Sequence, residues 1–71
     1  MRVYVNDESK EFVEGLSLTD LIRQLDLPAQ RIAVELNKEV VRRSAWDQTV
    51  LRDDDRIEIV HFVGGGDSLQ Q

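Results

Sequence analysis

The chain has 71 residues, no cysteine and a formal net charge of −5. This length allows a single domain with a compact core, and the lack of cysteine excludes disulfides, thiolate metal sites and cysteine nucleophiles. The acidic excess argues against a nucleic-acid partner, because nucleic-acid binders present a basic face to phosphate. The sequence shows no signal-peptide pattern and no apolar run long enough to span a membrane, so we expect a soluble, cytoplasmic protein.

Two short strands are predicted at the start of the chain. Residues 2–6 alternate, with Val3 and Val5 on one face, which is typical of a half-buried strand. Residues 7–9 are turn formers, and residues 10–14 are predicted to return antiparallel as the second strand. This segment is therefore interpreted as a hairpin.

One amphipathic helix follows the hairpin. Ser17 is a suitable N-cap, and Asp20 three residues later can complete a capping box. Pro28 lacks an amide hydrogen and restricts the residue before it, so we expect the helix to end near Leu27. Four apolar residues recur with helical spacing and predict one stripe facing the core: Leu18, Leu21, Ile22 and Leu25.

The second half of the chain begins with another pair of strands. Residues 31–37 alternate, and Asn37-Lys38 is predicted to form a tight turn because Asn tolerates a positive φ. Residues 39–41 then return as a short strand. The segment that follows looks irregular, with Ser44 expected to cap a single helical turn and Trp46 expected to act as a large apolar anchor.

Three adjacent aspartates, Asp53–Asp55, precede the last strand. Adjacent carboxylates point in different directions, and no histidine pair or second ligand cluster supports them, so a turn is favoured over a metal site. His61 is the single histidine, and it has no nucleophile or carboxylate partner in a recognisable arrangement, so we expect it on a strand surface. The sequence predicts no catalytic residue and no metal ligand.

The last strand, residues 56–62, has two apolar faces. Ile57 and Ile59 share the face assigned to the core, whereas Val60 and Phe62 share the face directed away from the helix. Apolar neighbours on an uncovered sheet face mark a partner-binding surface. The alternative is that a loop or the segment around Trp46 covers them.

The order of elements is strand, strand, helix, strand, short strand, strand. One helix packed on a mixed sheet of four to five strands makes an α+β domain, and the arrangement with the last strand beside the first is the β-grasp, or ubiquitin-like, fold. We predict this domain over residues 1–63 and a flexible tail that contains the glycines over residues 64–71.

The most specific stretch is DRIEIVHFVGGG (Asp55–Gly66), a strand that leads into glycines, supported by LNKEVV (Leu36–Val41). From Met1 to Gly66 the chain resembles the bacterial sulfur-carrier (ThiS) family of thiamine biosynthesis. The small subunit of molybdopterin synthase is a related carrier with the same fold and tail. The resemblance implies a protein cosubstrate and not an enzyme.

The resemblance also implies the chemistry of the tail. The carboxylate of Gly66, with Gly64 and Gly65 leading to it, is adenylated by a ubiquitin-activating-like adenylyltransferase that uses ATP and magnesium, and then becomes a thiocarboxylate. A cysteine desulfurase or related donor supplies the sulfur, and thiazole synthase receives it. The carrier itself binds no cofactor, and we expect it to be a monomer when free.

Five residues, Asp67–Gln71, follow the glycines, although members of this family normally stop there. While that peptide bond stands Gly66 has no free carboxylate, so we interpret the extension as the removable end of a precursor. An artefact and a copy that is not a working carrier are the alternatives. Two further functions stay open, a β-grasp interaction module that forms no conjugates and a protein-modifying tag with the same activation chemistry.

Overall fold

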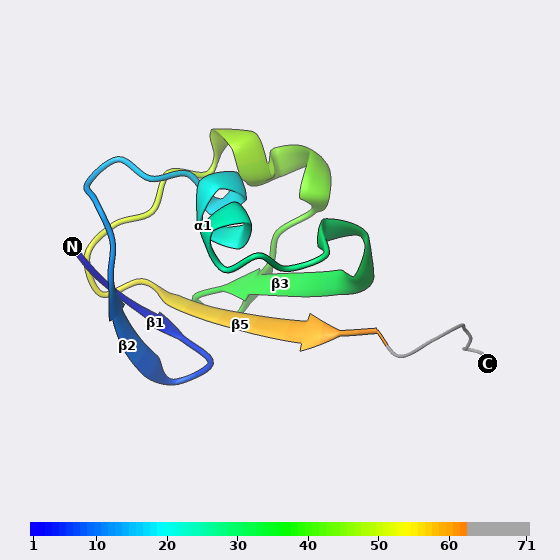
Figure 1. The fold of residues 1–71 in the computed structure, drawn as a ribbon, viewed down its shortest axis with the longest axis horizontal. Helices are drawn as coiled ribbons and strands as arrows, with labels where there is room; N and C mark the ends of the chain where they lie inside the picture. Colours follow the sequence, from blue (N-terminus) through cyan, green and yellow to red (C-terminus); the bar gives the residue numbers. More distant parts are fainter. Residues whose placement is uncertain (63–71) are drawn as a thin grey trace.

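The computed structural model describes residues 1–62, and the glycine tail lies outside this range. Five strands, one α-helix and two 3₁₀ helices follow one another along the described chain (Figure 1). Their bounds are β1 (Arg2–Val5), β2 (Glu8–Glu11), α1 (Leu18–Gln24), η1 (Ala29–Arg31), β3 (Ile32–Leu36), β4 (Glu39–Val40), η2 (Arg43–Gln48) and β5 (Arg56–His61).

The strands form one mixed sheet in the order β2-β1-β5-β3-β4. β1 and β5 pair in parallel, with Tyr4 opposite Arg56 and Val5 opposite Ile57, and the other neighbours pair antiparallel. The predicted mixed sheet, with its first and last strands adjacent and parallel, is confirmed. α1 and η2 lie on the same side of the sheet, and none of the described segments covers the opposite face (Figure 1).

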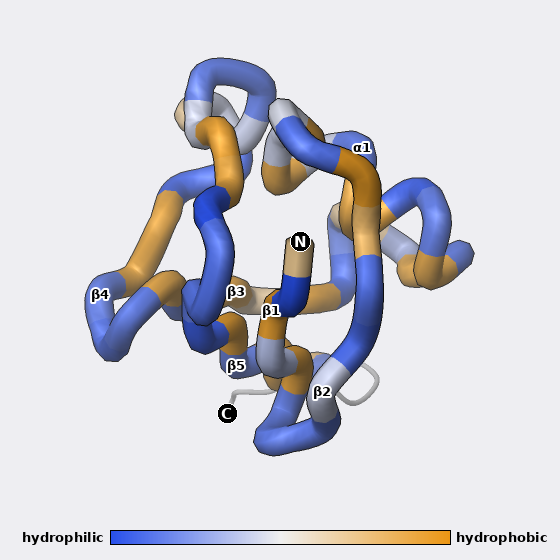
Figure 2. Tube along the Cα trace, turned by 90° about the vertical axis from the view of Figure 1, so that its left-hand side faces the viewer, coloured by the Kyte–Doolittle hydropathy of each residue, from blue (hydrophilic) through white to orange (hydrophobic). Residues whose placement is uncertain are grey.

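The core lies between the sheet and the helical layer. The residues of β1 alternate between hydrophilic and hydrophobic, which the colours of the tube in Figure 2 show. The predicted helical stripe is buried, except that Leu25 is half-buried at its end. The buried core residues are Val3, Val5, Leu16, Leu18, Leu21, Ile22, Ile32, Val34, Trp46, Leu51, Ile57 and Ile59.

Both ends of α1 are capped by local hydrogen bonds. At the start, the hydroxyl of Ser17 accepts a hydrogen bond from the amide of Asp20 (3.1 Å), and the Asp20 carboxylate accepts one from the amide of Ser17 (3.5 Å). The predicted capping box is confirmed. The end differs from the prediction, because α1 stops at Gln24, before the residues that the proline restricts.

Asp26 is the physical reason for this early end. Its φ is 56°, in the left-handed region, and its amide donates to the Arg23 carbonyl while the amide of Leu27 donates to the Ile22 carbonyl. This pair of bonds is a Schellman motif, in which one left-handed residue satisfies the last helical carbonyls. Asp occupies a position that is usually glycine, so this motif is hard to predict from the sequence.

The two hairpin turns have the same backbone form. Asn37 and Lys38 have φ values of 51° and 73°, which is the type I′ geometry that suits a two-residue hairpin, and this predicted turn is confirmed. In the first hairpin, Asn6 and Asp7 have φ values of 48° and 70°. The predicted turn at residues 7–9 was therefore wrong, and β2 begins at Glu8 instead of residue 10.

The irregular segment before the last strand is partly as predicted. Trp46 is 3% exposed, and its indole nitrogen donates to the Val41 carbonyl (2.9 Å), so its role as an apolar anchor is confirmed. The expected cap at Ser44 is wrong, because Ser44 lies inside η2 and the capping position belongs to Arg42, which makes no side-chain capping bond.

Candidate functional site

β5 is the element that leads to the glycines, and it lies in the middle of the sheet. It is held on one side by β1 and on the other by β3. Ile57 and Ile59 are 0% and 7% exposed, which confirms their assignment to the core. The strand is therefore held by β1, by β3 and by the core, and nothing within residues 1–62 covers its outer face.

Val60 and Phe62 lie on that outer face, and each is 59% exposed. Their predicted direction is confirmed, and no described residue covers them as a loop would. Ala33 lies opposite Val60 on β3, and Val40 on β4 is 72% exposed. We call these four residues, Ala33, Val40, Val60 and Phe62, the outer patch; that it binds a partner stays a prediction.

Two shallow hollows flank the outer patch. The first is bordered by Phe62, Ala33 and Val40 together with Arg42 and Arg43. The second lies beside Val60 and is bordered by charged side chains, which are Asp7, Glu35, Lys38, Arg56 and Glu58. An apolar centre with a charged and polar rim is the usual composition of a protein interface.

The charges on the outer face are not fully balanced. Glu35 and Glu58 are directly opposite each other on β3 and β5, and like charges in this position are destabilising. Closer to the start of β5, the Arg56 guanidinium lies 4.3 Å from the centre of the Tyr4 ring, a cation–π contact. Tyr4 also contacts a second arginine: the pKa of Arg2 is raised, mainly because its side chain forms a hydrogen bond with that of Tyr4.

Asn6 makes a contact with β5 that the sequence analysis missed. Its side-chain oxygen accepts a hydrogen bond from the amide of Ile59 (2.7 Å), and its side-chain nitrogen donates to the carbonyl of the same residue (3.2 Å). The amide of Asn6 also donates to the Ile57 carbonyl (2.8 Å). The Asn6 side chain therefore continues the β1–β5 ladder after the main chain of β1 has turned away.

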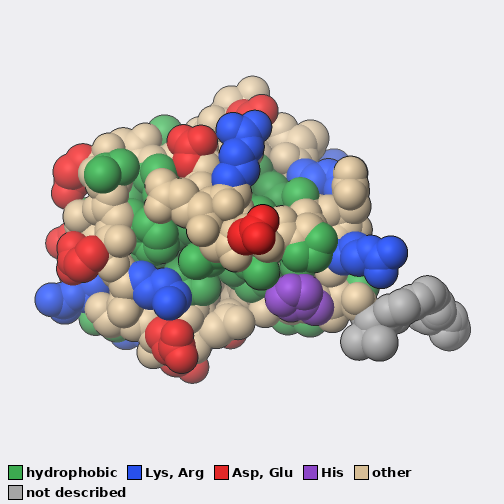
Figure 3. Space-filling view, in the orientation of Figure 1, with side chains coloured by type: hydrophobic (Ala, Val, Ile, Leu, Met, Phe, Trp, Pro, Cys, Tyr) green, Lys and Arg blue, Asp and Glu red, His purple; other side chains and the backbone are tan. Residues whose placement is uncertain are grey.

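His61 is exposed at the end of β5, as the sequence predicted. Figure 3 shows the histidine side chain (purple) at the surface, with hydrophobic side chains (green) beside it. Within residues 1–62 no group of three or more His, Asp or Glu side chains is arranged to hold a metal ion.

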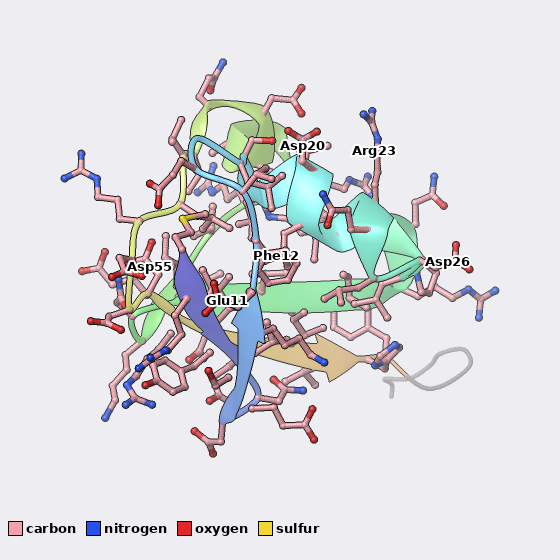
Figure 4. The ribbon with its side chains drawn as sticks, turned by 60° about the vertical axis from the view of Figure 1, so that its left-hand side comes forward. Glu11, Phe12, Asp20, Arg23, Asp26 and Asp55 are labelled. Carbon is pink, nitrogen blue, oxygen red and sulfur yellow. The ribbon has the colours of Figure 1, made fainter. Side chains whose placement is uncertain are left out.

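The three aspartates act as turn residues. The carboxylate of Asp53 accepts a hydrogen bond from the amide of Arg2 (2.7 Å), and that of Asp55 accepts one from the amide of Arg52 (2.8 Å). Asp54 has a φ of 69°. The turn interpretation is confirmed. The three aspartates lie before or next to the start of β5, at the opposite end of this strand from Phe62. In Figure 4 Asp55 lies on the other side of the domain from Asp26, which follows α1.

The predicted adenylation and thiocarboxylate site, Gly66, and the tail glycines before it, Gly64 and Gly65, lie outside the described residues. Their proposed role is therefore not tested by the geometry, and the same holds for the predicted boundary between domain and tail. No helix among residues 1–62 has both the length and the apolar character needed to cross a membrane.

The described fold defines the class of protein. One helix on a mixed sheet, with the first and last strands parallel at its centre, is the β-grasp arrangement. The crystal structure of the thiamine biosynthesis protein ThiS from Geobacter metallireducens matches with a TM-score of 0.82 and 38% identity, over 93% of this chain and 100% of that one. The predicted fold is confirmed.

Comparison of sequences then gives the family. The model of the ThiS family matches residues 3–66, and the chain belongs to this family, as its resemblance predicted. The sulfur carrier protein ThiS of Escherichia coli is 29% identical over 66 residues, which cover 93% of this chain and 100% of that protein. A thiazole synthase from Magnetococcus marinus is 41% identical over 66 residues, which cover 93% of this chain. The chain spans only 20% of the length of the thiazole synthases that it matches.

Proposed function

We propose that this chain is a sulfur carrier in thiamine biosynthesis, a cytoplasmic and monomeric protein cosubstrate that other enzymes act on. The observation that carries the proposal is the match to the ThiS family, because it extends from β1 through Gly66 and so includes the glycines. The similarity to a protein named as a sulfur carrier, over its whole length, supports the same conclusion.

The proposed chemistry takes place at the carboxylate of Gly66. A carboxylate is a poor electrophile, so an adenylating enzyme first transfers AMP to it from ATP, with magnesium, and releases pyrophosphate. A sulfur nucleophile derived from a cysteine desulfurase or related donor then attacks the carbonyl carbon. A carbon–sulfur bond forms and AMP leaves with the electrons of the broken bond. Where the nucleophile is a persulfide, the product of this attack is an acyl disulfide. A second thiol then cleaves its sulfur–sulfur bond and is oxidised to a disulfide with the departing sulfur, which leaves the thiocarboxylate.

The domain contributes position and recognition to this chemistry. β5 is held by both neighbouring strands, so the tail starts from a fixed point, and glycines add no side chains that would obstruct a narrow channel. The outer patch presents Val60 and Phe62 directly before the tail. We propose that this patch docks on the adenylating enzyme and on the enzyme that receives the sulfur.

Thiazole synthase is the proposed recipient. In the Magnetococcus marinus protein named thiazole synthase, a segment similar to this chain accounts for a fifth of the length. Joining a carrier and its recipient in one polypeptide raises their effective concentration for each other, which is useful when the two must meet. We propose that the same encounter delivers the sulfur from Gly66 of the present protein.

Intact mass spectrometry tests the function. A chain that ends at Gly66 is incubated with the adenylating enzyme of its own organism, ATP, magnesium and a sulfur donor. We expect its mass to rise by the difference between sulfur and oxygen, whereas the 71-residue chain should stay unchanged unless a protease first removes Asp67–Gln71. Gly66→Ala in the shorter chain is the matched control and should react more slowly, because the added methyl group crowds the channel.

Two outcomes would contradict this proposal. If the 71-residue chain forms the thiocarboxylate as fast as the shorter one, Gln71 and not Gly66 is the acceptor. If the shorter chain does not react, the β-grasp interaction module becomes the better interpretation.

A further inference from the structure

The two edges of β5 are paired over different lengths. On the β3 side the pairing continues through Ile32 opposite His61, and the amide of Phe62 donates to the Arg31 carbonyl (2.7 Å). On the β1 side the last contact is the one between the Asn6 side chain and Ile59. The hairpin then turns back, and β5 runs on past it (Figure 1).

This offset leaves the main chain of His61 open on the β1 side. Main-chain groups of successive strand residues point to alternate edges. Because Phe62 donates toward β3 and Ile59 bonds toward β1, the N–H and C=O of His61 point toward the β1 side. No described residue bonds to them there, and His61 is exposed.

A hollow lies beside this open edge. Leu25 and Leu27, which follow α1, border it on one side, and Val5 and Ile59 border it from the sheet. Its polar lining includes Lys10 and His61. The two leucines are half-buried, so they offer apolar surface to a side chain that enters from outside. The open edge and the hollow together offer what an added strand needs, main-chain groups along one side and a space for side chains on one face.

We propose that an extended segment of the adenylating enzyme adds to β5 at this edge as a further strand and pairs with the main chain of His61. The inference rests on the proposed function and specifies how the tail is recognised. Residues 64–66 are glycines and carry no side chain, so main-chain donors and acceptors are what a partner has to bind along this part of the chain. Addition of a strand to an open edge satisfies such groups directly.

The position also agrees with the outer patch. Val60 on β5 and Phe62 directly after it face the side of the sheet opposite the hollow. The side chains of an added strand alternate between the two faces, so one partner can pair with the edge, fill the hollow and cover the outer patch in a single docked state. The exposed main chain of His61 is then part of the surface that the partner recognises, and it lies shortly before the tail.

Two substitutions at His61 separate main-chain pairing from side-chain contact. Pro removes the N–H, which the fold does not use, and a strand tolerates Pro where its N–H faces outward. Ala removes the imidazole and keeps the N–H. The dissociation constant for the adenylating enzyme, measured by calorimetry, should rise about tenfold for His61→Pro, the scale expected for a lost main-chain hydrogen bond, and stay within about twofold of the unsubstituted chain for His61→Ala.

Amide hydrogen exchange provides a second readout on the unsubstituted chain. The amide of His61 should exchange rapidly in the free protein and become protected in the complex, whereas the amide of Phe62, bonded to Arg31, should be protected in both. Equal binding by His61→Pro and His61→Ala, or an unprotected His61 amide in the complex, would overturn the inference while leaving the carrier function intact. If the unsubstituted chain does not bind the adenylating enzyme, the proposed function fails and this inference falls with it.

Discussion

Replacement of Asn6 by Gly should weaken the fold markedly, although Asn6 is exposed. Glycine adopts the φ of 48° without strain, so the turn survives and the loss reports on the side chain. Two hydrogen bonds to Ile59 disappear, each worth about 0.5–1.5 kcal/mol. The free energy of unfolding should therefore fall by about 1–3 kcal/mol, out of a total of roughly 3–9 kcal/mol for a domain of this size.

Urea unfolding followed through the fluorescence of Trp46, which is buried in the core, measures this loss. A thermal midpoint gives a second estimate, because 1 kcal/mol shifts the midpoint of a small domain by about 4–8 °C. Asp7→Gly is the matched control: it lies in the same turn, has a φ of 70°, and should change stability by less than about 0.5 kcal/mol.

The exchange rate of the Ile59 amide links the loss of stability to its cause. In Asn6→Gly this amide should exchange faster by more than the change in global stability explains, since its acceptor has been removed. Two results would refute this reasoning: Asn6→Gly is as stable as Asp7→Gly, or the exchange of the Ile59 amide is unaffected. Water would then replace the Asn6 side-chain amide at no cost, and the Asn6 side chain would not act as a clamp, that is, as a group that holds β5 through Ile59.

Three further substitutions test separate parts of the structure. Ser17→Ala removes the helix cap and should lower the free energy of unfolding by about 1 kcal/mol in urea. Phe62→Ala should weaken binding to the adenylating enzyme more than tenfold in calorimetry, since aromatic anchors contribute about 2 kcal/mol or more, whereas Val13→Ala, at an apolar residue exposed elsewhere, should not. Glu58→Gln removes the repulsion from Glu35 and should raise stability by a few tenths of a kcal/mol, an increase that shrinks in high salt.

Much of the fold was predictable because local chemistry and long-range packing agree in it. Ser17, Asp20 and the apolar stripe of α1 favour the same helix that the core requires. The alternation of β5 likewise predicted both of its faces, because the pleat places Ile57 and Phe62 on opposite sides whatever the neighbouring strands are.

The first hairpin shows where local patterns stop being informative. Asn6, Asp7 and Ser9 all favour turns, so composition alone did not locate the two residues that adopt a positive φ. The pairing of β1 with β5 determines which residues form the turn. Because Val5 lies opposite Ile57, the side chain of the next residue, Asn6, reaches Ile59. This register joins residues more than fifty positions apart in the sequence, and no local pattern contains it.

The lengths of two strands connect the clamp with the open edge. β1 has four residues and β5 has six, and their parallel pairing starts at Tyr4 and Arg56, so β1 must run out before β5 does. The Asn6 side chain extends the pairing by two residues of β5, from Ile57 to Ile59, and stops there. A shorter β5 would place the glycines against the hairpin, where the sheet would enclose them, and a longer β1 would occupy the edge of His61. The difference in length therefore holds β5 firmly in the sheet and still leaves its last residues open to another protein.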